Sequence, residues 1–278
     1  MGKETIHSDW GTWLPDAVAA SEPDGVDVWY LGCNGFVLKA ADGTTLFVDP
    51  YLGTGDPPRT VRMIPVPFEP ADVRRADAIL GTHEHTDHVH GPSQAPILEG
   101  TDATLYAPPA SIEKATAWQT DYDIDDSDTE VVTPGETFDI GSLDITVEPA
   151  HDPDAVDSVS YVIEHDAGTF FHGGDARPSE GFADVGSRYD IDLAVVAFGS
   201  SGMIPDKQTR EPTYTQWYSE ENMAAEAANQ LQTDRLLPSH WDMWKGLTAD
   251  PEALRPHVRS FEYPRTLQTV EIGDRIEL

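Results

Sequence analysis

The sequence predicts an α/β (α+β) fold made of two mixed β-sheets with helices outside both. The order of the elements carries this prediction: several strand-like segments come first, a helix follows, further strands come next, and helix and strand then alternate. No repeat, low-complexity tract or linker divides the 278 residues, and a chain of this length can bury a full core. We therefore expect a single domain over residues 1–278, with residues 1–25 as an N-terminal helical extension.

The N-terminal part of the chain is predicted to form a short helix followed by three strands. Tryptophan, leucine, alanine and valine recur through Ser8–Ala20, which favours a helix packed on the body of the domain. Strand-like runs follow at Val26–Leu31, Gly35–Ala40 and Thr44–Asp49. The segment Gly32-Cys33-Asn34 has turn-forming residues and separates the first two strands.

The rest of the chain alternates apolar runs with helix and turn signals. Ala78–Gly81 is predicted to be a short buried strand, and Pro108–Trp118 a helix with proline in its first turn. Ser219–Leu231 is an alanine-rich helix with Ser219 as its expected N-cap, and the acidic stretch Asp121–Glu130 is expected to be a solvated loop. The further predicted elements are the strands Ala103–Tyr106, Glu130–Thr133, Glu136–Ile140, Leu143–Glu148, Val159–Glu164, Thr169–His172, Leu193–Phe198 and Arg235–Pro238, and the helix Pro251–Val258.

The charge of the chain is strongly acidic. Asp and Glu number 50 against 17 Lys and Arg, which gives a formal net charge of −33, yet 7 Trp, 9 Tyr and 9 Phe indicate a folded protein. At molar salt the Debye length falls to about 3 Å, so the self-repulsion of such a surface is screened. The composition therefore favours a halophilic cytoplasm, and an ordinary acidic mesophilic enzyme is the alternative.

The same composition argues against several classes of protein. No basic stripe is present to neutralise the phosphates of nucleic acid, and an acidic surface also disfavours anionic membranes. No apolar run approaches the ~20 residues needed to span a bilayer, and residues 1–4 lack the apolar core of a signal peptide. Cys33 is the only cysteine, so we expect a reducing compartment, and we expect this residue to be small, buried and apolar in role.

One short motif concentrates potential metal ligands. The run Thr82-His83-Glu84-His85-Thr86-Asp87-His88 directly follows the apolar stretch that predicts a short strand. Its histidines and carboxylates cannot all face one way on a regular helix or strand, but they suit a loop that leaves a strand and turns into a helix. Imidazole and carboxylate together favour Zn, Mn or Fe. A histidine-rich surface turn is the alternative, and we interpret the run as a metal site.

Four further positions repeat one pattern, in which a short apolar strand ends in a potential ligand. Asp49, His151, Asp175 and His240 each come at or just after the end of a predicted strand. Ligands at strand ends along one sheet edge can converge without being close in sequence. Taken alone, Asp175 after two glycines suits a turn, but with the histidine motif present we expect it to be a ligand.

These motifs, in this order, resemble the metallo-β-lactamase fold superfamily. A narrower resemblance links the chain to the L-ascorbate-6-phosphate lactonase (UlaG-like) branch. It rests on Trp10-Gly-Thr-Trp13-Leu14, Trp29-Tyr-Leu-Gly-Cys33-x-Gly35, Phe171-His172-x-Gly-Asp175, Asp206-Lys207 and His240-x-Asp242-x-Trp244. The resemblance implies a four-layer αββα sandwich of the metallo-hydrolase type.

The resemblance also implies a site with two divalent ions, Zn or Mn, with Fe as a further candidate. The ligand set it implies is His83, His85 and His151 for the first ion, Asp87, His88 and His240 for the second, and Asp175 as a bridge. A metal-bound hydroxide would then attack a lactone or a phosphorylated sugar ester, with Asp87 and Asp175 as catalytic residues. A phosphodiesterase, including phospholipase-D-like relatives of the same fold, and a non-catalytic metal-binding protein are the alternatives.

Residues around the ligands are assigned supporting roles. Asp49, His172 and Asp242 are expected beside the ligands, where they would orient a histidine or its backbone. Arg177 and Lys207 are the candidates for recognising a substrate phosphate, although exposed ion pairs worth ~0–1 kcal/mol are the alternative role. We expect a small-molecule substrate, neither nucleic acid nor membrane as partner, and we leave a homo-oligomer open.

Overall fold

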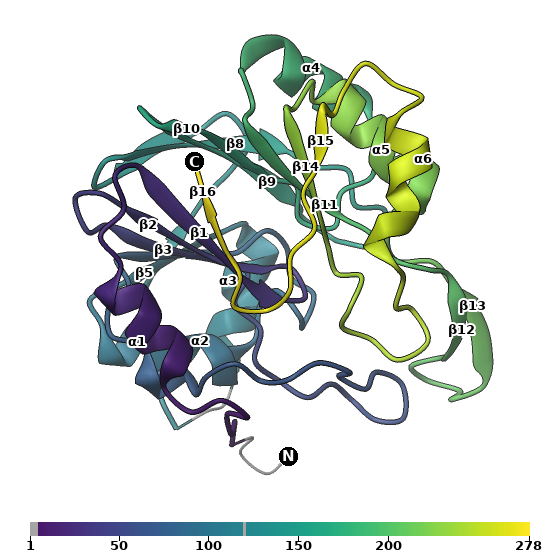
Figure 1. Cartoon of the computed structure of the whole chain (residues 1–278). Helices are drawn as coiled ribbons and strands as arrows, with labels where there is room; N and C mark the ends of the chain where they lie inside the picture. Colours follow the sequence, from purple (N-terminus) through teal and green to yellow (C-terminus); the bar gives the residue numbers. More distant parts are fainter. Residues whose placement is uncertain (1–4, 119–120) are drawn as a thin grey trace.

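Two seven-stranded sheets face each other, and helices cover the outer face of each (Figure 1). The computed structural model describes residues 5–118 and 121–278. The layers run helix, sheet, sheet, helix, which confirms the predicted αββα sandwich of two mixed sheets.

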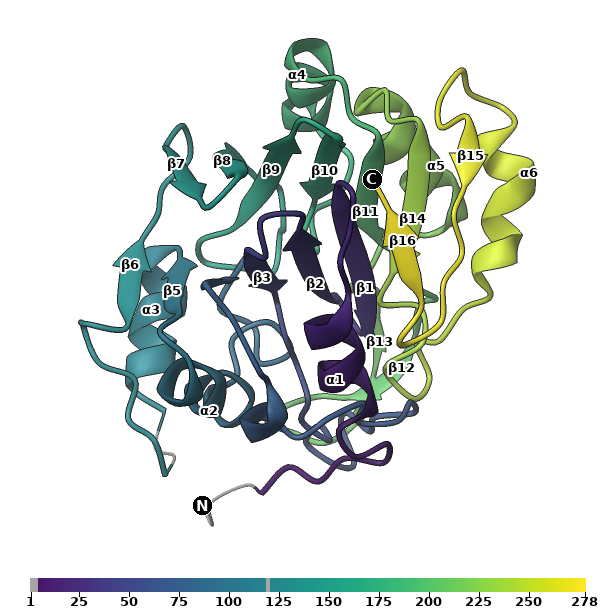
Figure 2. The same ribbon diagram turned by 60° about the vertical axis from the view of Figure 1, so that its left-hand side comes forward.

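The first sheet is antiparallel at one edge and parallel at the other. Antiparallel pairing joins its first four strands, and parallel pairing joins the last four. In spatial order the strands are β16 (Arg275–Glu277), β1 (Val26–Gly32), β2 (Gly35–Ala40), β3 (Thr45–Val48), β4 (Ala78–Leu80), β5 (Thr104–Ala107) and β6 (Thr129–Val131). The helices α1 (Trp13–Ala20), α2 (Gly91–Gly100) and α3 (Pro109–Thr116) lie on its outer side (Figure 2).

The second sheet has a parallel half and an antiparallel half. In spatial order its strands are β15 (Thr266–Leu267), β14 (Arg235–Ser239), β11 (Leu193–Ala197), β10 (Gly168–His172), β9 (Val159–His165), β8 (Leu143–Pro149) and β7 (Thr137–Ile140). Its outer helices are α4 (Glu180–Arg188), α5 (Glu221–Gln230) and α6 (Arg255–Val258). Two 3₁₀ turns, η1 (Pro70–Asp72) and η2 (Pro251–Leu254), complete the helical elements of the described residues.

Side chains alternate between two apolar layers along the central strands. In β1, Val28 and Tyr30 point into the space between the sheets, whereas Trp29 and Leu31 pack against the outer helices. Because both faces are covered, every residue of β1 and β2 is buried, as expected for strands in the middle of a sandwich. The result is a rigid frame whose strand ends can hold side chains in fixed positions.

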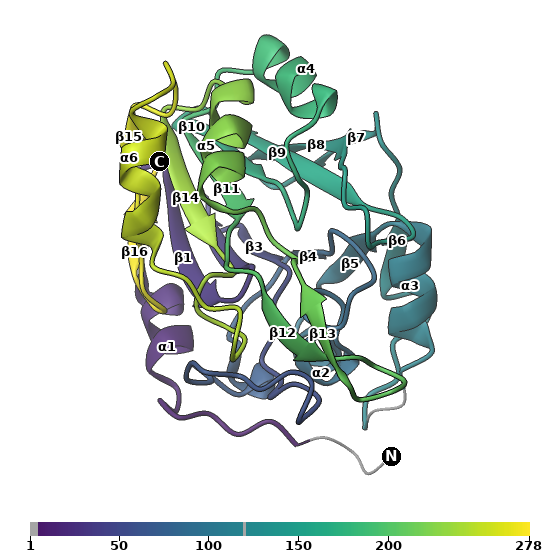
Figure 3. The same cartoon turned by 90° about the vertical axis from the view of Figure 1, so that its right-hand side faces the viewer.

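A two-stranded hairpin projects from the sandwich (Figures 1 and 3). Its strands are β12 (Gly202–Pro205) and β13 (Pro212–Thr215). Met203 pairs with Tyr214 across the two strands, and both side chains are exposed. This hairpin was not predicted from the sequence.

Helix α4 was missed, α2 was expected after the histidine motif but without predicted bounds, and one cap was wrong. Helix α2 begins with Gly-Pro and contains Pro96, and glycines also interrupt α4, so neither segment has a clear helical signature. Helix α5 begins at Glu221 with Glu220 at the N-cap position, so Ser219 is not the cap. Within the described residues, no helix is long and apolar enough to cross a membrane.

Candidate metal centre

The histidine motif is a tight turn that begins two residues after β4. The backbone N–H groups of His88 and Val89 both donate to the carbonyl of His85, at 3.1 and 2.8 Å. The chain therefore turns back on itself before α2 starts at Gly91. This geometry directs the motif's histidines toward the end of the second sheet, as the loop prediction required.

The first group of potential ligands joins the motif to the end of β10. His83 Nε2 lies 3.0 Å from His85 Nδ1 and 3.9 Å from Asp175 Oδ2. One ligand atom from each of these three residues lies within 4.8 Å of the others, so together they could hold a metal ion.

The second group shares Asp175 with the first. The Nε2 atoms of His88 and His240 lie 3.3 Å apart. Asp175 Oδ2 is 3.3 Å from His88 Nε2, and Asp175 Oδ1 is 3.3 Å from His240 Nε2. Asp175 therefore lies between the two groups and belongs to both.

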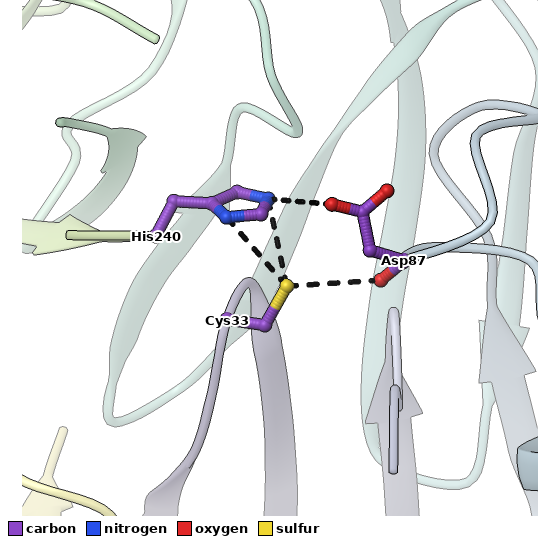
Figure 4. A group of neighbouring side chains, drawn as sticks. All are labelled: Cys33, Asp87 and His240. Atoms are coloured by element: carbon purple, nitrogen blue, oxygen red, sulfur yellow. Dashed lines mark hydrogen bonds and ion pairs between the residues drawn. The ribbon is translucent and has the colours of Figure 1, made fainter. Parts of the chain in front are cut away.

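Asp87 also lies close to His240. Its Oδ2 is 3.7 Å from His240 Nε2 and accepts a hydrogen bond from Trp244 Nε1 at 3.1 Å. Together with Cys33, these two residues form a third cluster with metal-ligand spacing (Figure 4). The structure thus brings Asp87 to the centre, and Trp244 fixes the orientation of its carboxylate.

His151 lies outside the centre, and Asp152 takes the place predicted for it. The His151 side chain is exposed, whereas Asp152 Oδ2 is 3.6 Å from His83 Nε2 and 3.9 Å from His85 Nδ1. The reason is the turn after β8, in which Asp152 Oδ1 accepts the backbone N–H of Asp154 at 2.9 Å. That turn directs the aspartate inward and its neighbour outward, so we correct the assignment from His151 to Asp152.

The chemistry of these residues fits a divalent cation. The side chain of Asp152 is only 3% exposed, and its Oδ2 has no hydrogen-bond partner among the described residues. A buried carboxylate oxygen without a partner is costly unless a cation compensates it. The mixture of imidazole nitrogens and carboxylate oxygens around it is the ligand set of Zn, Mn and Fe sites.

The electrostatics of the centre follow from burial and from the close charges. Burial raises the pKa of Asp175, but His240 and His88 outweigh burial and hold that pKa well below its usual range. Burial, and then Asp175, raise the pKa of the Asp152 carboxyl. Burial, with His88 second, lowers the pKa of His83 well below its ordinary value, which favours the neutral ring that a metal requires.

One buried carboxylate orients two of the histidines. Asp49 Oδ2 lies 2.7 Å from His88 Nδ1 and accepts the Thr82 hydroxyl at 2.6 Å. Because Thr82 Oγ1 donates to Asp49, it can accept from His83 Nδ1, which is 3.0 Å away. Both histidines then carry their proton on Nδ1 and present the lone pair of Nε2 to the centre. Asp49 thus contacts His88 directly and reaches His83 through Thr82.

The turn between β1 and β2 reaches into the same centre. Asn34 Nδ2 donates to Asp175 Oδ1 at 3.5 Å, and the Asn34 carbonyl lies 3.0 Å from Nε2 of the buried His172. Asp242 accepts from the hydroxyl of Tyr30 at 3.0 Å. His172 and Asp242 therefore hold this turn, and within the described contacts neither hydrogen-bonds a ligand histidine. Asn34 was missed because it is the unspecified position of the motif Trp29-Tyr-Leu-Gly-Cys33-x-Gly35.

Three non-glycine residues at the centre have left-handed backbone conformations. The φ angles are 60° at Cys33, 43° at Asp49 and 67° at His240. Such residues cost of order 1–3 kcal/mol each and cluster at functional sites. Three such residues in one place indicate that the two sheets hold these side chains in strained positions that serve function rather than stability.

The two predicted phosphate-binding residues lie in different surroundings. Arg177 Nη2 donates to the Gln216 carbonyl at 2.8 Å and lies 3.5 Å from Asp154 Oδ2. The carbonyl of Asp154 is 3.2 Å from His85 Nε2, so Arg177 lies at the rim of the centre. Its Nε is buried without a hydrogen-bond partner among the described residues. Lys207 is exposed between β12 and β13.

A lysine not singled out in the sequence holds the histidine motif from α3. Lys114 Nζ donates to the Glu84 carbonyl and, at 3.0 Å, to Thr86 Oγ1. Burial is the main cause that lowers the pKa of Lys114 to about 8, and the charge of Lys207 adds to the lowering. The carboxylates of Asp87 and Glu84 oppose it. A single lysine on a helix carries no functional signal in a sequence, so only its contacts reveal this role.

A four-layer sandwich with clustered histidines and aspartates at its strand ends defines a metallo-hydrolase of the metallo-β-lactamase fold. The sequence agrees, since residues 44–241 match the profile of the Beta-lactamase superfamily domain. The chain belongs to this superfamily, as its motifs predicted.

Curated relatives match along most of the chain. The probable L-ascorbate-6-phosphate lactonase UlaG of Escherichia fergusonii is 26% identical, over 89% of this chain and 78% of the relative. Its counterpart from Salmonella paratyphi B is 25% identical with the same coverage. The predicted similarity to the UlaG-like branch is therefore confirmed.

Solved structures share the fold at low identity. Igni18, a metallo hydrolase from Ignicoccus hospitalis, has a TM-score of 0.66 at 18% identity, covering 90% of this chain and 97% of the other. The metallo-β-lactamase fold protein YhfI of Bacillus subtilis has a TM-score of 0.61 at 18% identity, covering 92% and 99%. CmlA, a diiron β-hydroxylase of Streptomyces venezuelae, has a TM-score of 0.65 at 16% identity, covering 92% and 55%.

Proposed function

We propose that this protein is a two-metal hydrolase whose substrate is a small lactone, or a related ester, that carries an anionic group. The observation that supports a two-metal site is the position of Asp175. Its two carboxylate oxygens face His88 and His240, and Oδ2 also faces His83. A single carboxylate between two histidine groups is the arrangement expected of a bridge between two ions.

The ligand set that we propose differs at one residue from the set implied by family resemblance. His83, His85 and Asp152 would hold the first ion, and Asp87, His88 and His240 the second, with Asp175 shared. Zn or Mn, or Fe as a further candidate, suit this mixture of nitrogen and oxygen ligands. When bound, two such ions lower the pKa of a shared water toward 7 and polarise the carbonyl or phosphoryl oxygen of the substrate.

The residues of the chain supply orientation and proton transfer. Trp244 donates to Asp87 Oδ2 and so holds that carboxylate where it can accept the proton that an attacking water loses. Burial raises the pKa of Asp87, but His88 and His240 outweigh burial and lower it. Asp175 contacts both histidine groups and so fixes their separation. The attacking water and the substrate carbonyl would then be positioned before the reaction begins.

The similarity to UlaG and the position of Arg177 support the substrate class. Relatives named as L-ascorbate-6-phosphate lactonases match most of this chain. Arg177 is one of only 17 basic residues in a chain with 50 acidic ones, and it lies at the rim of the centre with an unpartnered buried Nε. The charge of Lys207 contributes to lowering the pKa of Lys114. An anionic group on the substrate would be attracted to these cations.

The first experiment measures metal content per chain, followed by a screen of lactones, phosphorylated lactones and bis-p-nitrophenyl phosphate. About two ions per chain and hydrolysis of a lactone would support the proposal. Hydrolysis of the phosphodiester alone would favour a phosphodiesterase. Bound metal with no hydrolysis of any ester would favour a non-catalytic metal-binding protein, and absence of metal after chelator-free purification would overturn the two-metal site.

A matched pair of variants tests the anionic group. Arg177→Gln should raise KM for a phosphorylated lactone several-fold more than KM for its unphosphorylated counterpart. Arg255→Gln is the control, because Arg255 forms its ion pair with Glu252 at the start of α6, on the outer side of the second sheet. Equal effects of Arg177→Gln on both substrates would contradict phosphate recognition by Arg177.

A further inference from the structure

The single cysteine of the chain lies inside the metal centre. Cys33 is fully buried in the turn between β1 and β2. Its Sγ lies 3.6 Å from both ring nitrogens of His240 and 3.9 Å from the backbone carbonyl of Asp87. Figure 4 shows the thiol, the imidazole and the Asp87 carboxylate gathered together, each from a different part of the chain. One ligand atom from each lies within 4.8 Å of the others.

Three contacts hold the cysteine in this position. The backbone N–H of His240 donates to the Cys33 carbonyl at 2.7 Å, and the Tyr30 hydroxyl, whose single proton is shared with Asp242, lies 3.0 Å from the same carbonyl. The Cys33 N–H in turn donates to Asp242 Oδ1 at 3.4 Å. The turn is therefore tied to both sheets, and its side chain is fixed beside His240.

A separate observation shows that this metal centre favours cations. Asp152 Oδ2 is buried and unpartnered, and it points toward His83. Asp175 connects that part of the pocket to His240, because its two oxygens face both histidines. The cysteine thus belongs to a centre in which a buried carboxylate oxygen without a hydrogen-bond partner independently favours a cation.

We propose that Cys33 is a sulfur ligand of the second metal ion, beside Asp87 and His240, and that this ligand makes the centre prefer Zn²⁺ to Mn²⁺. The inference rests on the proposed two-metal centre and adds a ligand to it. On binding, the S–H bond of Cys33 breaks, its proton leaves to solvent, and a sulfur lone pair forms the bond to the ion. No electron is transferred in this step.

The distances suit this role. A nitrogen at about 2.0 Å and a sulfur at about 2.3 Å from one tetrahedral zinc lie roughly 3.5 Å apart, close to the 3.6 Å between Sγ and His240 Nε2. Sγ is equally far from Nδ1, but Nε2 is the ring nitrogen that also lies near Asp87 and Asp175, so Nε2 is the one that would share an ion with the sulfur. Thiolates favour Zn²⁺, whereas Mn²⁺ favours oxygen ligands.

Cobalt substitution tests the proposal without relying on catalysis. The full-length protein is stripped of metal with a chelator and titrated with Co²⁺ while its absorption spectrum is recorded. We expect visible ligand-field bands from the bound Co²⁺ and, in addition, the near-ultraviolet charge-transfer band of a sulfur–cobalt bond. Because the chain has one cysteine, such a band can arise only from Cys33.

Two variants serve as controls. Cys33→Ser should keep the ligand-field bands but lose the charge-transfer band, and its preference for Zn²⁺ over Mn²⁺ in competition should fall. Cys33→Gly should behave in the same way, and glycine suits the φ of 60° at this position, so a folding defect of the serine variant would not obscure the result.

The outcomes separate this inference from the proposed function. Ligand-field bands without a sulfur band in the unmodified protein would overturn Cys33 as a ligand and leave the two-metal hydrolase in place. A sulfur band that persists in Cys33→Gly would also overturn it. Failure to bind Co²⁺ at all would overturn both proposals.

Discussion

Asp152 Oδ2 lies 3.6 Å from His83 Nε2, while the adjacent His151 is exposed to solvent. A change of one residue in register thus exchanges an imidazole for a carboxylate beside His83, in the proposed first metal position. The consequence is chemical, since a carboxylate reduces the net charge of a bound divalent ion and an imidazole does not.

This pair of neighbours gives the first prediction. Asp152→Ala should lower the metal content to about one ion per chain or less and should abolish hydrolysis, because the first position loses an anionic ligand. His151→Ala should leave both unchanged, since its side chain faces solvent. Elemental analysis of the two variants is the measurement, and loss of metal in His151→Ala would contradict the assignment.

Asp49 provides a second prediction, because it fixes the tautomers of two histidines without facing the metals. Asp49→Asn should weaken metal binding about 10–100-fold and lower the free energy of unfolding by about 1–3 kcal/mol, since buried hydrogen bonds are lost. Competition with a chromophoric chelator measures the affinity. Asp77→Asn is the control, because Asp77 also accepts a backbone N–H, from Thr45 at the start of β3. Metal affinity in Asp77→Asn as low as in Asp49→Asn would refute the mechanism.

The buried position of Lys114 predicts a pH dependence of stability. Burial first lowers the pKa of Lys114 to about 8 in the folded protein, against about 10.4 in the unfolded chain. Between about pH 8 and about pH 10.4 the unfolded chain binds more protons than the folded protein. The contribution of Lys114 to the free energy of unfolding therefore rises with pH, and it is lost as the pH falls through about 8. Part of the side chain is exposed, so solvent screening limits the effect to about 2 kcal/mol.

Urea unfolding from pH 7.5 to 9.5, in the unmodified protein and in Lys114→Met, checks this sign. The free energy of unfolding of the unmodified protein should rise relative to that of the variant. Lys245→Met, at an exposed lysine, should follow the unmodified protein. If the free energies of unfolding of Lys114→Met and of the unmodified protein differ by the same amount at every pH, only the hydrogen bonds of Lys114 to Glu84 and Thr86 contribute.

The net charge of −33 predicts a strong dependence of stability on salt. Raising KCl from about 0.1 M to about 1 M shortens the Debye length from about 10 to about 3 Å and screens the repulsion among acidic side chains. The Tm should therefore rise steeply with KCl in a thermal scan followed by circular dichroism. An unchanged Tm across this range would remove the salt-adapted interpretation of the composition.

The sequence alone determined the layered fold and most of the metal motif. Runs of β-branched and aromatic residues specified β1 and β2, and the crowding of His83, His85 and His88 behind a short apolar strand specified the loop, because these signals are local. The bounds of helix α2 could not be predicted, since Gly91 and Pro96 remove the local signature of a helix that tertiary packing nevertheless stabilises.

Only the tertiary structure decided which side chains complete the centre. Whether His151 or Asp152 turns inward depends on the turn after β8 and on the position of His83, about seventy residues earlier in the chain. Cys33 and Lys114 acquire their roles from contacts with His240 and with the histidine motif. Such contacts join residues far apart in sequence, and the packing of two sheets sets them, so no local pattern encodes them.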